Sequence, residues 1–158
     1  MSLTDAQQQA LATALRAEIN PGVVAALTLG DSVVLERWCN DPSALDAWHW
    51  QCGAIELFNA ANITLFNNLT DKNRDTWKYI LAYAPHDYRL QKNRESIADV
   101  WGSVLGLPIL QGCAIKATNV QRYLGGAVIA TTNAVSALVL TFTGRVSGSE
   151  VSEALNRF

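Results

Sequence analysis

The strongest indication of the fold is TDAQQQALATALRAEINPGVVAALTLGDSVVLERWCN, which occupies residues 4–40. Thr4 and Gln7 stand three positions apart as a capping box, in which each side chain bonds to the other residue's backbone. Apolar residues then recur at helical spacing at Leu11, Leu15 and Ile19. We therefore expect an amphipathic helix that starts at Thr4.

Two further short helices are expected in the same stretch. Asn20 is a favourable N-cap and Pro21 suits a first helical turn, so the second helix should begin there and stop at Gly30. Asp31 can cap a third helix, which should end in a turn at residues 40–43. Three short helices separated by such short turns predict a compact helical unit.

Helical patterns continue through the middle of the chain. One helix should be capped by Thr70 or Asp71, and the next should end at Gly106. Beyond Pro108 we expect another helix, which runs to about Leu124.

The character of the sequence then changes to residues that favour strands. Leu138, Leu140 and Phe142 alternate with their neighbours at the period of a half-buried strand. Residues 128–131 are a candidate hairpin partner, with the turn near residues 132–134.

These patterns together predict a mainly α fold in a single domain over residues 1–158. We expect a compact helical bundle at 4–124, a β-hairpin or extended arm at 127–144 and a short C-terminal helix at 148–158, which Ser147 and Glu150 cap.

Composition excludes several classes of protein. Of 158 residues, 49% are hydrophobic and 16% are charged, so the chain is neither disordered nor highly charged. A net charge of -2 gives no strong attraction to nucleic acid. With so few charges, much of the surface should be neutral or apolar. Either partner subunits cover that surface, or the low charge content simply reflects a well-filled core. Three scattered cysteines are typical of buried, reduced thiols in the cytosol.

An uncharged run at residues 123–144 is long enough to cross a bilayer. It contains Gly125, Gly126 and several threonines, however, which make a poor lipid-facing helix. A β segment in a soluble protein explains this run better, and we expect no membrane association.

The sequence predicts no catalytic, cofactor-binding or metal site. His49 and His86 are the two histidines, and neither has a metal-ligand partner at helical spacing. We expect a packed His49 and a solvated His86. A dispersed set of converging acids stays open as an alternative, because one sequence does not exclude it.

Tryptophan is the largest compositional signal. Trp38, Trp77 and Trp101 fall on apolar helical stripes and should be core residues. Trp48 and Trp50 lie in a brief extended or helical stretch, where one of them is a candidate anchor for a partner. The candidate partner-binding residues are Val128, Ile129, Leu138, Leu140, Phe142, Arg145 and Trp48.

The order of motifs resembles a family of small proteins encoded among the head and neck genes of tailed bacteriophages. Nearly the whole chain takes part. The matching segments lie at residues 15–18, 26–31, 38–40, 74–77, 94–101, 117–122, 142–144 and 150–152, and at Trp50. Thr143 stands where the family pattern carries an acid.

This resemblance implies a head–tail connector or adaptor in the virion neck, assembled in the host cytoplasm. Copies would form a homo-oligomeric ring under the portal protein and dock the neck or tail proteins, with DNA at most passing through the lumen. The arm at 127–144 would reach a neighbour by strand addition. The alternatives are a tail terminator, a capsid-stabilising protein or a small enzyme with a dispersed site.

Overall fold

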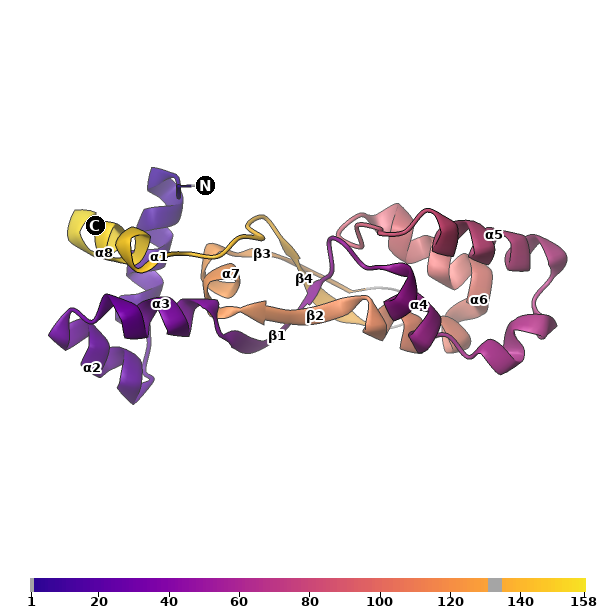
Figure 1. Cartoon of the computed structure of the whole chain (residues 1–158), viewed down its shortest axis with the longest axis horizontal. Coiled ribbons are helices and arrows are strands. Elements are labelled where there is room, and N and C mark those ends of the chain that lie inside the picture. Colours follow the sequence, from indigo (N-terminus) through magenta and orange to yellow (C-terminus); the bar gives the residue numbers. More distant parts are fainter. Residues whose placement is uncertain (1, 131–134) are drawn as a thin grey trace. The chain divides into compact units, whose positions relative to one another are not determined.

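We describe the fold from a computed structural model, which covers residues 2–130 and 135–158, without the side chains of residues 127, 129 and 130 (Figure 1). The elements in chain order are α1 (Asp5–Ala17), α2 (Pro21–Leu29), α3 (Ser32–Asn40), β1 (Pro42–Trp48), α4 (Ala54–Ala60), the 3-10 helix η1 (Ile63–Asn68), α5 (Asp71–Ala82), α6 (Gln91–Gly112), β2 (Ala114–Thr118), α7 (Asn119–Leu124), β3 (Gly126–Ala130), β4 (Ser136–Leu140) and α8 (Gly148–Arg157). The mainly α class, with a strand-bearing segment before a C-terminal helix, is confirmed.

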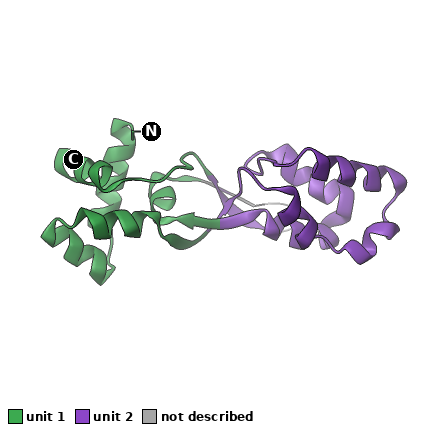
Figure 2. Cartoon of the chain, viewed as in Figure 1, with its two compact units in different colours: residues 1–45, 116–126, 140–158 green, residues 46–115, 127–139 purple. Residues whose placement is uncertain are grey.

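The chain forms two compact units, each with its own hydrophobic core (Figure 2). Unit 1 consists of residues 1–45, 116–126 and 140–158, and unit 2 of residues 46–115 and 127–139. Each of the four crossings between the units falls inside one of the four strands. No pattern in the sequence indicated this division, and the single folding domain stays a prediction.

Local hydrogen bonds explain where the first three helices begin and end. Thr4 and Gln7 form the expected capping box, and the side chains of Asn20 and Asp31 each accept two backbone N–H bonds at the starts of α2 and α3. Gly30 ends α2 with φ of 65°, a left-handed conformation that glycine adopts without strain. The predicted starts of these helices are confirmed.

A buried amide ties α3 to the segment before α8 in unit 1. Asn40 Nδ2 donates to the carbonyl oxygens of Glu36 at 2.9 Å and Val146 at 2.7 Å, and Asn40 Oδ1 accepts from the Val146 N–H at 3.1 Å. The Gly148 N–H donates to Glu36 Oε2 at 2.8 Å. Because buried polar groups are costly when unpaired, these bonds specify one packing of the two segments.

A second polar chain in unit 1 links α1, α3 and α7. Trp38 Nε1 donates to Tyr123 Oη at 2.7 Å, and that hydroxyl donates to Glu18 Oε2 at 2.6 Å. Arg122 donates to the same carboxylate oxygen at 3.0 Å. The hydrogen bond from Tyr123 holds the pKa of Glu18 below its ordinary value of 4.5, and burial raises the pKa of Tyr123 to about 12.

Aromatic packing forms the core of unit 2. The rings of Trp77 on α5 and Trp101 on α6 meet edge to face, with centroids 5.4 Å apart. Arg94 is also buried in this unit, where its Nη1 donates at 2.7 Å to the carbonyl oxygens of Tyr88 and Arg89. Its guanidinium also lies 5.2 Å from the ring centroid of Trp48.

The four strands form one sheet in the order β2-β1-β4-β3. β1 and β4 are parallel, with Ala47 opposite Leu138. β3 and β4 are neighbours, as expected for the predicted hairpin, while the predicted turn at residues 132–134 lies outside the described residues. β4 ends at Leu140, so Phe142 falls beyond the strand and packs instead against the core of unit 1.

Two local predictions were wrong. The stretch at 40–43 is not one turn, because Pro42 opens β1, and the first position of a strand tolerates a proline. The helix predicted beyond Pro108 is in fact the end of α6, followed by β2 and α7. Pairing of β2 with β1 outweighs the helical periodicity of that stretch, because strand propensity depends on tertiary neighbours.

No helix in the described part of the chain is both long enough and apolar enough to cross a membrane.

Replacement of Asn40 by Asp should destabilise the protein by about 1–3 kcal/mol, because the two amide donations are lost and a carboxylate then faces two buried carbonyl oxygens. Urea unfolding of the full chain measures the change. The control is Asn59→Asp on an exposed position of α4, for which we expect little effect. Equal stability of the two variants would contradict the structural role of Asn40.

Glu18 should make the stability of the protein depend on acid pH. Its folded-state pKa lies below 4.5, so the ionised carboxylate contributes stability above about pH 4.5, and this contribution is lost as the pH falls through the folded-state value. We expect Glu18→Gln to lower stability at neutral pH and to flatten the loss below pH 4.5. Thermal unfolding across pH tests this, with Glu153→Gln on the exposed side of α8 as the control.

Candidate functional site

The second helix of unit 1 is apolar on all sides. The nine residues of α2 are PGVVAALTL, with no charge among them. Val23 and Ala26 are buried, whereas Val24 is exposed and Leu29 keeps 79% of its surface. A helix that is apolar all round is normally covered on all sides. In α2, one side is covered by the chain itself and the other is not.

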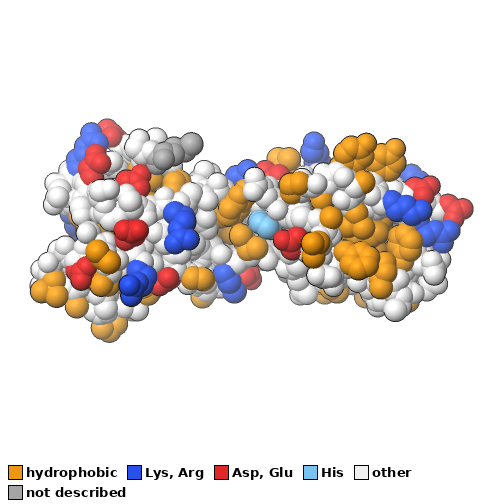
Figure 3. Space-filling view, in the orientation of Figure 1, with side chains coloured by type: hydrophobic (Ala, Val, Ile, Leu, Met, Phe, Trp, Pro, Cys, Tyr) orange, Lys and Arg blue, Asp and Glu red, His pale blue; other side chains and the backbone are white. Residues whose placement is uncertain are grey.

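The third helix adds to the same uncovered surface. α3 buries Leu35 and Cys39 in the core of unit 1, but it leaves Val33 65% exposed and Val34 partly exposed. α2 and α3 are in contact and are joined by only Gly30 and Asp31. We define the α2–α3 apolar face by its exposed residues Val24, Leu29, Val33 and Val34; Figure 3 shows hydrophobic side chains over α2.

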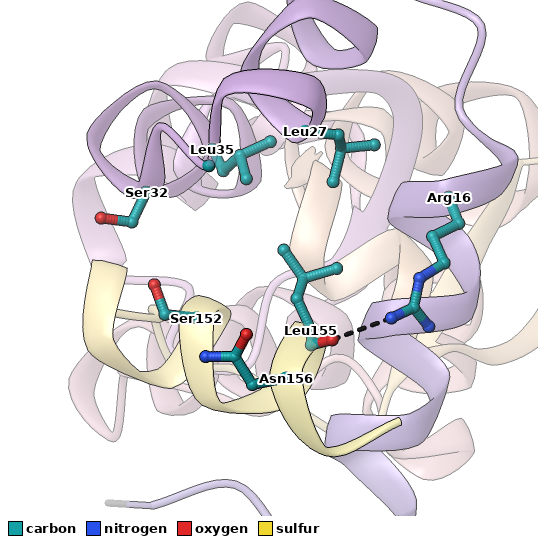
Figure 4. Close-up of a pocket in the computed structure, with 8 residues that line it drawn as sticks. Arg16, Leu27, Ser32, Leu35, Ser152, Leu155 and Asn156 are labelled. Carbon is teal, nitrogen blue, oxygen red and sulfur yellow. Dashed lines mark hydrogen bonds between the residues drawn. The ribbon is translucent and has the colours of Figure 1, made fainter.

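A pocket of about 380 Å³ lies beside this face within unit 1 (Figure 4). Leucine side chains from α2, α3 and α8 and polar groups from α1, α3 and α8 line it. Its lining residues are Arg16, Leu27, Gly30, Ser32, Leu35, Ser152, Leu155 and Asn156. The volume falls at the small end of the range for ligand sites, and the mixed lining fits one apolar side chain with a polar surround.

The polar wall of the pocket is held by the end of α8. Arg16 Nη2 donates to the carbonyl oxygen of Leu155 at 2.8 Å, as drawn in Figure 4. The last carbonyls of a helix have no partner inside the helix, so this arginine satisfies one of them. Arg157 in turn donates to Asp5 Oδ1 at 2.7 Å and to Gln8 Oε1 at 3.1 Å. α1 and α8 are thus fixed to each other, which keeps the pocket preformed.

A second hollow of about 290 Å³ lies along α3 and carries charge. Its lining residues are Val33, Glu36, Arg37, Asn40, Asp41 and Arg145. Val33 therefore belongs both to the apolar face and to this charged hollow. Together they form a surface with an apolar centre and charged residues to one side, the usual arrangement of a protein interface.

Unit 2 exposes its own apolar surface. Tyr79 on α5 and Tyr83, the C-cap of that helix, are both exposed, and their stacked rings have centroids 5.6 Å apart. Ile55 and Phe58 on α4 are also exposed. α4 and α5 are in contact, so these side chains come from neighbouring helices. Tyrosine is enriched at interface anchors because it offers a large rigid surface with a polar tip.

In residues 2–130 and 135–158, no three side chains of His, Cys, Asp or Glu come together as a metal site would require. His49 packs edge to face against Trp50, with ring centroids 5.7 Å apart. His86 differs from the expected solvated residue: it is partly buried, and its Nε2 lies 2.6 Å from the carbonyl oxygen of Ile80.

The candidate partner-binding residues fall into different environments. Trp48 is fully buried in the core of unit 2, and Leu138 and Leu140 are buried as well, so none of the three offers its side chain to a partner in this structure. Val128 on β3 and Arg145 beside the charged hollow are exposed. Phe142 is partly buried in unit 1. The side chain of Ile129 lies outside those described.

Sequence reasoning missed the α2–α3 apolar face. The nine uncharged residues of α2 could have indicated it. A short helix that is apolar all round cannot bury every side against a single core, so one side should need another partner. No sequence pattern indicated the pocket, because its lining residues come from segments far apart in the sequence, at α1, α2, α3 and α8.

Comparison with known proteins gives no relative: no protein-family model matches the chain, and neither a curated protein nor a solved structure does.

Proposed function

We propose that this protein is an assembly subunit, which binds further copies of itself in a ring and acts as a head–tail connector under the portal of a tailed bacteriophage. The observation that carries the proposal is the uncovered side of α2, an uncharged helix next to a preformed pocket. The phage setting comes from the sequence resemblance alone.

A ring requires two different surfaces on each copy, because its contacts are heterologous and close by rotation. The chain offers one candidate on each unit: the α2–α3 apolar face with its pocket on unit 1, and the exposed pair Tyr79 and Tyr83 on unit 2. We propose that the second surface of one copy docks on the first surface of the next. An aromatic side chain is then the natural occupant of a pocket with leucine walls.

The edge of the sheet supports a further contact. β3 is at one end of the strand order, and Val128 on it is exposed. An edge strand presents unpaired backbone groups that a strand from another protein can bind. This edge suits the portal or the next neck protein, whereas the helical surfaces suit neighbouring copies.

The alternative virion roles use the same surfaces and differ in partner. A tail terminator would bind tail-tube subunits, and a capsid-stabilising protein would bind capsid subunits. Light scattering of the purified chain, alone and with purified portal complexes, distinguishes the connector from these other roles. A ring-sized mass on the portal supports the connector. A chain that stays monomeric and ignores the portal contradicts the connector role.

Charge placed on the α2–α3 apolar face should weaken self-association. We expect Leu29→Glu to weaken it by about thirtyfold, because a central interface residue contributes about 2 kcal/mol and a buried unpaired carboxylate opposes docking. Sedimentation velocity over a concentration series measures the association constant. The control is Thr13→Glu, which adds the same charge to an exposed position of α1. Equal association of both variants with the unmodified chain would exclude this face as the interface.

A further inference from the structure

The outer side of α3 carries three exposed residues of different character, one helical turn apart. Val33, Arg37 and Asp41 follow one another at intervals of four positions, and Asp41 is the C-cap of the helix. Residues at this spacing lie on the same side of a helix, and all three line the hollow of about 290 Å³ beside α3. From its start to its end, this side of α3 is therefore apolar, then positive, then negative.

The two charges on this side have no ion-pair partner in their own chain. Among the described residues, neither Arg37 nor Asp41 forms an ion pair. The neighbouring Glu36 is bonded within unit 1, because its Oε2 accepts from the Gly148 N–H at 2.8 Å. Arg145 adds a second guanidinium to the hollow. The Arg37 and Asp41 side chains are thus available to a partner outside the chain.

The exposed side of α5 in unit 2 shows the same kinds of group in the reverse order. Lys72, Asp75 and Tyr79 are exposed and follow at intervals of three and four positions, which places them on one side of the helix. Asp75 is held only loosely by Lys78, at an N···O distance of 3.5 Å with side chains 71% and 66% exposed. From its start to its end, this side of α5 is positive, then negative, then aromatic.

We propose that α5 of one copy packs antiparallel on α3 of the next copy, with a fixed register. The facing pairs are Val33–Tyr79, Arg37–Asp75 and Asp41–Lys72. This inference rests on the proposed docking of unit 2 on unit 1, and it adds the orientation and the register of that contact.

Spacing and charge both favour the antiparallel orientation. One turn advances by about 6 Å along either helix, so groups one turn apart on α3 stay opposite groups one turn apart on α5. A parallel arrangement could keep the Arg37–Asp75 pair. It would, however, place Lys72 against Val33 and an aromatic ring against a carboxylate, so two of the three contacts would set a charge against an apolar group.

The second tyrosine extends the contact onto α2. Tyr83 follows Tyr79 by one turn and stacks on its ring, and it is 70% exposed. Leu29 ends α2 four positions before Val33 and is 79% exposed. Antiparallel docking brings Tyr83 to this end of α2, beside the pocket with leucine walls.

Charge exchange in the full-length protein tests the register. Arg37→Glu and Asp75→Arg should each weaken self-association about tenfold, because each sets like charges opposite each other. In the double variant every contact between copies joins one reversed residue to the other, so we expect association close to that of the unmodified chain. Sedimentation velocity over a concentration series measures all three. The control combines Arg37→Glu with Asp99→Arg at an exposed position of α6, and it should stay weak.

Cross-linking between two different chains tests the orientation. A short bismaleimide should join a chain with Asp41→Cys to a chain with Lys72→Cys, because these positions face each other in the antiparallel register. A chain with Val33→Cys should join the same Lys72→Cys chain only if the helices are parallel. The three native cysteines are buried, so the added thiols are the accessible ones. Intact mass identifies the linked dimer.

The outcomes distinguish a wrong register from a wrong interface. If Leu29→Glu weakens association but the double charge variant stays as weak as Arg37→Glu alone, the copies dock on this face in another register. A linked dimer through Val33→Cys would overturn the antiparallel orientation. A chain that does not associate at all, alone or on portal complexes, would overturn both this inference and the proposed function.

Discussion

The parallel pairing of β1 with β4 is the constraint on which the rest of the structure depends. It places Ala47 opposite Leu138, so two segments that are far apart in sequence become neighbours. β2 and β3 then add to either side of this central pair. A parallel pair needs a long connection, and here that connection contains most of unit 2. Unit 1 in turn consists of three separate stretches of chain, so neither core forms from one continuous segment.

Within unit 1, one helix serves both stability and recognition. α3 turns Leu35 and Cys39 inward, and its Asn40 bonds to Val146 in the segment before α8. The opposite side of the same helix exposes Val33. Because the inner side is held by buried hydrogen bonds as well as by apolar contacts, the outer side is presented on a rigid support. Rigid presentation lowers the entropic cost of docking, which favours the proposed role in assembly.

The predictions made from the sequence differ most from the structure at the candidate partner-binding residues. Alternation at residues 138–142 indicated a strand with a half-buried face, and the strand is present as β4. Whether that face meets a partner or the chain's own core depends on neighbours that alternation does not specify. Leu138 and Leu140 are buried, as is Trp48 on the parallel strand β1. Other apolar residues stay exposed, among them Leu29 on α2, Val33 on α3 and Val128 on β3.

By itself, the sequence determined the features that rest on hydrogen bonds between close neighbours in the chain. The capping residues Thr4, Asn20, Asp31 and Ser147 set the starts of four helices, because each cap bonds to backbone groups two or three positions on. Only the tertiary structure decided that residues 114–118 form a strand, that α2 is left half covered, and that Cys52 and Cys113 share the core of unit 2. These features depend on contacts between segments distant in the sequence, whose energies no local pattern contains.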